Sequence, residues 1–303
     1  MLENLLNNSL SYSLALTLIH FIWQGLLIAF TLKSALLFIS DKNPQLRYAL
    51  ASLAMLACLL LPITTLWVIH QPETRDLMTI SSLSPLSEFN FVTNHYNPQA
   101  LQSYVVEYLP YVSLLWLSIV FCLALKVFIE IWSINRLPHQ AIVPTNKELT
   151  ARYVELVAQI GLKRKPRLLI SLKTNVPMAI GWLKPVILLP IGMLSGLTSA
   201  QLEMLLLHEL AHIRRHDYMV NFIQTLILTL LFFHPAVHWI SKQMRHEREY
   251  CCDDIAVQQC GNAIAYAHTL ADTADICRQH RKHTIPHLAM AASGGDLKQR
   301  VVR

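Results

Sequence analysis

The sequence predicts an α-helical membrane region with three N-terminal spans, followed by a globular α+β domain. Composition is the first reason: of 303 residues, 53% are hydrophobic and 15% are charged, and the mean hydropathy is +0.38. Those values are too apolar for an ordinary soluble domain. The second reason is that three long apolar runs precede residue 137, and the third is that short helix and strand patterns follow it.

Three apolar runs are long enough to cross a membrane, at residues 14–39, 48–69 and 108–134. An α-helix rises about 1.5 Å per residue, so about 20 residues cross a hydrocarbon core about 30 Å thick. Pro62 should kink the second run, because proline removes a helix hydrogen bond. The segment before the first run contains no Lys or Arg, which is atypical of a cleaved signal peptide.

The charges of the loops predict the orientation of these spans. The short turn between the first two spans contains Lys42 and Arg47, whereas the loop at 71–104 contains a single basic residue, Arg75, and three acidic ones. Six more Lys and Arg residues lie between residues 136 and 165. Cytoplasmic loops carry an excess of Lys and Arg. We therefore expect an external N-terminus, an external and mostly irregular 71–104 loop, and a cytoplasmic domain after the third span.

The rest of the chain has the pattern of a globular domain. We assign residues 1–136 to the membrane region, 137–285 to the domain, and 286–303 to a basic segment expected to lead to a further span in a longer protein. A helix is predicted at 146–160, ending at Gly161. Three short strand candidates follow, bounded by Gly and Pro residues: Arg167–Ser171, Val176–Ile180 and Val186–Leu189.

The stretch from Thr198 onward predicts a helix that carries a metal-binding motif. Thr198 is followed three residues later by Gln201, which is the pattern of a capping box. On such a helix His208 and His212 are four residues apart, so both imidazoles leave the same face. Two ring nitrogens in that arrangement can bind one Zn²⁺ at about 2.0–2.1 Å. Glu209, beside the first histidine, can take a proton from a metal-bound water.

A second helix, predicted at 245–256, would supply the third ligand. Glu249 and Asp253 lie four residues apart on one face of it. Glu249 would complete a three-ligand site, and Asp253 would accept a hydrogen bond from a ligand histidine. The alternative third ligands are Glu247, Cys251 and Cys252.

The apolar run Met219–Ile240 has the length of a fourth span, but it separates the two metal-binding helices. A straight span would place those helices on opposite sides of the membrane. We therefore predict a helix at 219–240 that contacts the membrane without crossing it. Pro235 would provide the necessary bend.

Taken together, these features resemble the membrane zinc metallopeptidases of the BlaR/MecR type. The resemblance covers nearly the whole chain, and its motifs indicate this family in combination rather than one by one. It rests on the three spans and on the runs GWLKPVILLP (181–190), HELAHIRRHDYMVN (208–221) and FFHPAVHWISKQMRHEREYCCDD (232–254). The Glu-x-x-x-Asp arrangement is also similar to that of thermolysin-like enzymes.

The resemblance implies a zincin-like (gluzincin) domain and assigns a role to each site residue. The zinc ligands would be His208, His212 and Glu249. Glu209 would be the general base, and Asp253 would hold a ligand from behind. The protein would be a multi-pass protein of the bacterial inner membrane with a cytoplasmic peptidase domain.

Receptors of that type act in signal transduction, in which a beta-lactam bound outside leads to loss of a repressor. The implied substrate is therefore a repressor-like protein or the chain itself. Such receptors continue through a fourth span into an extracellular penicillin-binding sensor, whose Ser-x-x-Lys motif is not found in these 303 residues. We expect either a truncated chain or a response to a different signal.

The expected chemistry is amide hydrolysis, in which Zn²⁺ lowers the pKa of its water from about 15.7 to about 7. An extended substrate would add to an exposed edge strand, where proline is tolerated. The candidate strand residues are Val176, Pro177, Met178, Ala179 and Ile180. The candidates for stabilising the oxyanion are His216, His246 and Tyr250.

Two other functions fit parts of the pattern. One is a constitutive membrane quality-control protease, and the other is a signalling scaffold in which a structural zinc fastens two helices. Glu209 argues against the scaffold, because a structural site needs no such carboxylate. The sequence has no nucleic-acid-binding motif, so we expect no direct nucleic acid partner. Membrane lipid and a second copy of the chain, as a homodimer, are the other partners considered.

Overall fold

The computed structural model describes residues 9–71, 98–181, 184–279 and 297–302, without the side chains of 98–107, 279, 297 and 298. The chain divides into two compact units. The first comprises residues up to Phe38, Ser52–Ala124 and Ile227–Ile240. The second comprises Ile39–Ala51, Leu125–Leu226 and the chain from Ser241 onward.

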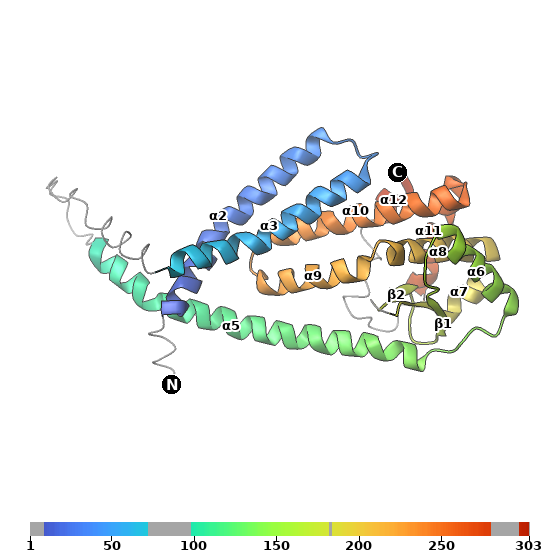
Figure 1. The fold of residues 1–303 in the computed structure, drawn as a ribbon, viewed down its shortest axis with the longest axis horizontal. Coiled ribbons are helices and arrows are strands. Elements are labelled where there is room, and N and C mark those ends of the chain that lie inside the picture. The colour runs from blue at the N-terminus through green and yellow to red at the C-terminus, as the bar shows by residue number, and fades with distance from the viewer. Residues whose placement is uncertain (1–8, 72–97, 182–183, 280–296, 303) are drawn as a thin grey trace. The chain divides into compact units, whose positions relative to one another are not determined.

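Three long helices form the N-terminal part of the chain: α2 (Ser9–Phe38), α3 (Pro44–His70) and α5 (Pro98–Arg136) (Figure 1). In the part of the chain that the structure describes, these are the helices long and apolar enough to cross a membrane. The predicted three spans are thus confirmed by length and composition. Most of the predicted 71–104 loop lies outside the described residues, and residues 98–104 belong to α5.

The apolar run Met219–Ile240, expected as one helix, is divided between two. Helix α9 (Asp217–Leu230) ends before a short turn, and α10 (Pro235–Cys260) begins after it. Pro235 can start a helix because the first turn leaves its backbone nitrogen without an internal partner. The chain therefore bends between Leu230 and Pro235, just before the proline that was expected to cause the bend.

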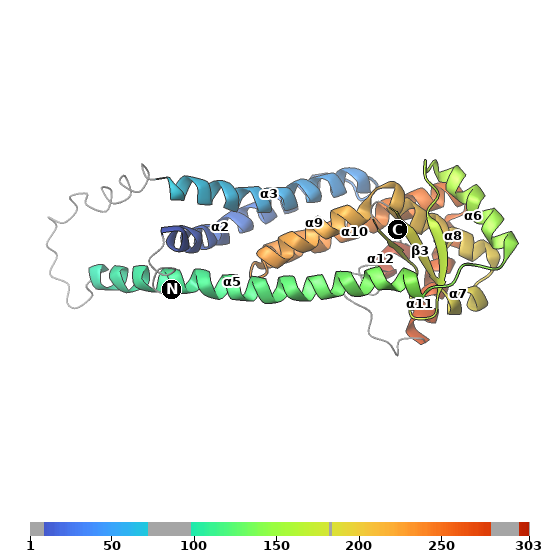
Figure 2. The same cartoon turned by 60° about the horizontal axis from the view of Figure 1, so that its bottom comes forward.

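Helices α9 and α10 run side by side in opposite directions (Figure 1 and Figure 2). The Nε2 atom of Gln224 on α9 donates to the Ser241 carbonyl on α10 at 2.9 Å and to its hydroxyl at 2.7 Å. Arg248, further along α10, donates to Gln224 Oε1 at 2.8 Å. Because these contacts are buried, they fix the hairpin that returns the chain from α9 to α10.

A three-stranded sheet lies in the second unit. Its strands are β1 (Arg167–Ser171), β2 (Met178–Ile180) and β3 (Val186–Pro190), in the order β1-β3-β2. Strand β1 is parallel to β3, and β2 is antiparallel to it. All three strand candidates are strands, although β2 begins at Met178 rather than at Val176. Because β3 is central, β2 forms an edge of the sheet.

The central strand β3 is fully buried because both of its faces are covered. Ile187 and Leu189 pack in one cluster with Leu206 of α8 (Ser199–Arg214). Val186 and Leu188 point to the other face and pack in a second cluster that includes Met178 of β2. Alternation along the strand thus places one apolar cluster on each face of the sheet.

The remaining elements frame this core. They are η2 (Leu137–Gln140), α6 (Lys147–Ile160), α7 (Ile191–Gly196), α11 (Ala263–Gln279) and α12 (Leu297–Val302). Helix α6 ends at Gly161, whose φ of 77° is a left-handed conformation that glycine adopts without steric cost. The predicted capping box of α8 is present: Gln201 N donates to Thr198 Oγ1, and Thr198 N donates to Gln201 Oε1.

Candidate metal centre

Helix α8 presents His208 and His212 on one face, one turn apart. Their Nε2 atoms are 3.1 Å from each other. His208 is buried, with 4% of its surface exposed. Two imidazole nitrogens that face one point, one buried and one half-buried, favour a shared cation, since leaving such polar atoms without a partner is costly.

Glu249 of α10 faces the same point. Its Oε2 atom is 3.5 Å from His208 Nε2, and its Oε1 atom is 3.8 Å from His212 Nε2. Three ligands placed tetrahedrally at about 2.0–2.1 Å from a zinc ion would lie about 3.3 Å from one another. The three side chains are therefore close to the spacing that such an ion requires. In addition, Glu249 Oε2 is buried and accepts no hydrogen bond from the residues that the structure describes.

The competing ligands lie elsewhere. Glu247 Oε1 accepts a hydrogen bond from Arg47 Nε at 2.7 Å, and one from Gln243 Nε2 at 2.7 Å. The Cys252 thiol lies on the far side of His212, 3.3 Å from its Nδ1 atom. Cys252 belongs to a second group of possible ligands, with His212 and Asp217 on the Nδ1 side of His212, whereas the group formed by His208, His212 and Glu249 includes none of these alternatives.

Asp253 lies behind His208, where a residue that orients this ring would lie. Its Oδ1 atom is 3.1 Å from His208 Nδ1. The Tyr266 hydroxyl of α11 donates to the same Oδ1 at 2.7 Å and lies 3.0 Å from His208 Nδ1. With the Nδ1 proton donated to Asp253, the lone pair of His208 Nε2 is free to bind a metal.

Asp217 plays the matching part for His212. Its Oδ2 atom is 2.9 Å from His212 Nδ1 and accepts from Arg215 Nε at 3.3 Å. Sequence reasoning did not select Asp217, although it belongs to the same motif stretch. It follows the end of α8, after His216 with a φ of 58°, so helical spacing gives no information about its position. Sequence reasoning also missed Tyr266 and Arg300, which both donate hydrogen bonds to Asp253, because they are far from the motif in sequence.

The electrostatics of the centre favour a bound cation. Burial lowers the pKa of His208, but its close contacts with the Asp253 and Glu249 carboxylates outweigh that effect and raise the pKa to about 9. Burial raises the pKa of Glu249, but the charge of His212, the close contact with His208 and the charge of Arg300 together lower it to about 2. At neutral pH this site therefore holds a positive charge among carboxylates, and a divalent ion can supply that charge instead of a proton.

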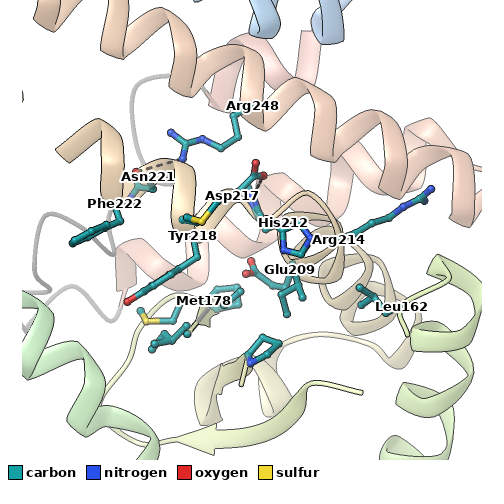
Figure 3. Close-up of a pocket in the computed structure, with 18 of the residues that line it drawn as sticks. Leu162, Met178, Glu209, His212, Arg214, Asp217, Tyr218, Asn221, Phe222 and Arg248 are labelled. Atoms are coloured by element: carbon teal, nitrogen blue, oxygen red, sulfur yellow. Dashed lines mark hydrogen bonds and ion pairs between the residues drawn. The ribbon is translucent and has the colours of Figure 1, made fainter. Parts of the chain in front are cut away.

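A cavity of about 560 Å³ opens beside the candidate ligands (Figure 3). Glu209 and His212 both line it, and Figure 3 shows the Glu209 carboxylate beside the His212 ring. The edge strand contributes another part of the wall, made by Pro177, Met178, Ala179 and Ile180. Val176 is instead packed in the core under the sheet.

Of the three oxyanion candidates, His216 alone is among the described residues that line this cavity. The hydroxyl of Tyr250 donates to Gln299 Oε1 at 3.3 Å. Tyr218, which follows Asp217, also lines the cavity, and its side chain extends toward Met178 (Figure 3). The cavity thus brings a carboxylate, the candidate metal ligands and the edge of a sheet to one place.

Comparison with known proteins identifies the family of the chain. The family described as BlaR1 peptidase M56 matches residues 20–303. The chain is 28% identical over 138 residues to the Regulatory protein BlaR1 of Bacillus licheniformis, covering 46% of this chain and 23% of that protein. It is 30% identical over 91 residues to the Methicillin resistance mecR1 protein of Staphylococcus aureus, covering 29% of this chain and 16% of that protein. The alignments thus span less than a quarter of either relative. The resemblance predicted from the sequence is confirmed.

Proposed function

The chain belongs to the BlaR1 peptidase M56 family, and from this premise we propose that it is a membrane-anchored, zinc-dependent endopeptidase with a zincin-like (gluzincin) domain. One observation carries the proposal: His208, His212 and Glu249 direct their ligand atoms to one point, within 4.8 Å of one another. Glu209 lies in the cavity beside them. Three protein ligands next to an open cavity are typical of a catalytic zinc site, whereas a structural site is closed by a fourth.

In the proposed mechanism, His208, His212 and Glu249 would hold a zinc ion, which would act as a Lewis acid toward the scissile carbonyl and a water molecule. Glu209 is the general base, which takes a proton from the attacking water and returns it to the leaving amine. Asp253 and Asp217 hold the Nδ1 sides of His208 and His212, so that both Nε2 lone pairs stay directed at the ion.

The substrate is a polypeptide that binds in extended form along β2. Two observations support this: β2 is an edge strand, and its residues line the cavity that contains Glu209. An added strand would use those backbone groups of Met178–Ile180 that do not face β3. The names of the relatives, one a regulatory protein and the other a methicillin resistance protein, favour a regulatory target. We propose a repressor-like protein or the chain itself.

The test is metal analysis and peptide cleavage by the purified full chain in detergent. We expect about one zinc per chain, and cleavage of an unfolded protein substrate that stops with a chelator and returns with added Zn²⁺. Tightly bound zinc without cleavage of any polypeptide, including this chain, would indicate a structural site. A protein that binds no zinc would contradict the proposal altogether.

We further propose that the peptidase domain is cytoplasmic and that the apolar run Met219–Ile240 contacts the membrane without crossing it. Phe222, Ile223 and Leu226 on α9 support the contact, because each is more than 40% exposed. An exposed apolar face of this kind suits the boundary between lipid headgroups and hydrocarbon.

Cysteine labelling in intact cells tests this topology. Single cysteines would replace Ser84, Lys147 or Lys242 in a chain without its native cysteines. An impermeant thiol reagent should label only the cysteine at Ser84, because the positive residues near the other two favour the cytoplasm. Labelling at Lys242 but not at Lys147 would mean that the run crosses the membrane, which would also separate Glu249 from the histidines.

A further inference from the structure

Arg300 of α12 lies against two acidic residues of the candidate metal centre. Its side chain is 5% exposed. The guanidinium forms two hydrogen bonds to Asp253, with Nη2 donating to Oδ1 at 2.6 Å and Nε to Oδ2 at 2.8 Å. A third nitrogen, Nη1, is 3.4 Å from Glu249 Oε2.

These two hydrogen bonds fix the orientation of the Asp253 carboxylate. Two parallel N–H donors match the two oxygens of a carboxylate, and the planar fork of arginine permits no rotation between them. The Tyr266 hydroxyl donates to Asp253 Oδ1 from another side, at 2.7 Å. The same Oδ1 atom is 3.1 Å from His208 Nδ1, so the plane of the carboxylate determines the direction of the ring.

The place of Arg300 distinguishes it from a residue that blocks the metal position. Asp253 contacts His208 at Nδ1, whereas the ligand atoms of His212 and Glu249 gather at Nε2 on the other side of the ring. The Nε and Nη2 atoms that hold Asp253 are therefore behind His208, while Nη1 lies beside Glu249 Oε2. Arg300 also offsets the negative charge that a second buried carboxylate brings next to Glu249.

We propose that Arg300 is a positioning residue of the zinc centre: it orients Asp253 and, through Asp253, the ligand His208. The inference rests on the proposed function, since it takes the centre to bind zinc. It also extends the peptidase domain to α12, beyond the boundary at residue 285 expected from the sequence.

The test compares zinc affinity in the full chain with Arg300→Ala, Arg300→Lys and the control Arg278→Ala. Arg278 is the matched arginine, because its side chain is 78% exposed and lies 3.9 Å from Asp275. We expect Arg300→Ala to weaken zinc binding about 10–100-fold in a chelator competition, the range typical of residues that support a ligand. Arg300→Lys should recover only part of this loss, since a point charge cannot make both contacts. Arg278→Ala should bind zinc as the wild type does.

A second measurement asks whether the effect passes through Asp253. In an Asp253→Asn background, Arg300→Ala should weaken zinc binding less than about 2-fold, because contacting residues do not contribute additively. The inference would be overturned if the two substitutions weakened zinc binding by independent factors, or if Arg300→Ala had wild-type zinc affinity.

Faster peptide cleavage by Arg300→Ala with unchanged zinc affinity would also overturn the inference and would identify Arg300 as a blocking residue. If Arg300→Ala does not fold, the same comparison is made with Arg300→Lys, in the wild-type and in the Asp253→Asn background. A wild-type chain without zinc would instead refute the proposed function.

Discussion

Replacing Glu249 with Ala is expected to remove zinc from the chain, from about one ion to nearly none after gel filtration. The carboxylate oxygens of Glu249 are 3.5 and 3.8 Å from the two histidine Nε2 atoms. Without them the ion would keep two protein ligands in a site built for three. The loss of affinity should therefore exceed the about 10–100-fold effect of residues that only support ligands.

Glu247→Ala is the matched control, two residues away on the same helix. It should leave the zinc content unchanged, because Glu247 is directed at Arg47 instead, at 2.7 Å. The variant should nevertheless unfold at a lower temperature. Glu247 is 1% exposed, and breaking a buried ion pair costs up to about 3–5 kcal/mol. Arg47 keeps a contact with Asp41 at 3.1 Å, so the cost should fall toward the lower end.

Metal analysis and thermal unfolding of the two variants separate these effects. If Glu247→Ala loses zinc and Glu249→Ala keeps it, the third ligand is Glu247 and the pairing of Glu249 with Asp253 has no role. Cys252→Ser should also keep its zinc, because the thiol contacts the Nδ1 side of His212. Loss of zinc in that variant would indicate that the thiol takes part in binding the ion.

The parts of the site that the sequence could predict are those that depend on one helix at a time. His208 and His212 share a face because they are four residues apart, and the same spacing aligns Glu249 with Asp253. Periodicity does not predict which helices contact each other. The contact between α8 and α10 was predicted because a site with two histidines needs a third ligand, and the two helices do place His208, His212 and Glu249 together.

The rest of the centre depends on turns and on distant segments. Asp217 reaches His212 because the chain changes direction at His216, whose positive φ ends the helical register. Tyr266 and Arg300 come from α11 and α12, and no spacing rule relates those helices to the motif. For residues 219–240 the sequence predicted a bend at Pro235 but not the division into two helices, since mean hydropathy does not distinguish one long apolar helix from two that form a hairpin.

Glu209→Gln is expected to slow peptide cleavage about 10²–10⁴-fold, the usual contribution of a general base, with zinc content unchanged. Glutamine has nearly the shape of glutamate but cannot accept the proton of the attacking water. The Glu209 carboxylate lies in the cavity rather than in the group of candidate ligands, so the ion should remain bound.

The control is the same substitution on the same helix at Glu203. That side chain is 28% exposed and pairs with Arg152 at 2.9 Å, away from the cavity. Glu203→Gln should cleave peptide at the wild-type rate.

Measuring kcat, KM and zinc content together distinguishes a general base from a metal ligand at Glu209. Full activity in Glu209→Gln would assign the base to another residue, whereas loss of both zinc and activity would make Glu209 part of the metal site. An unchanged KM with a reduced kcat is the result that a general base requires, because the substrate strand still binds while the proton transfer fails.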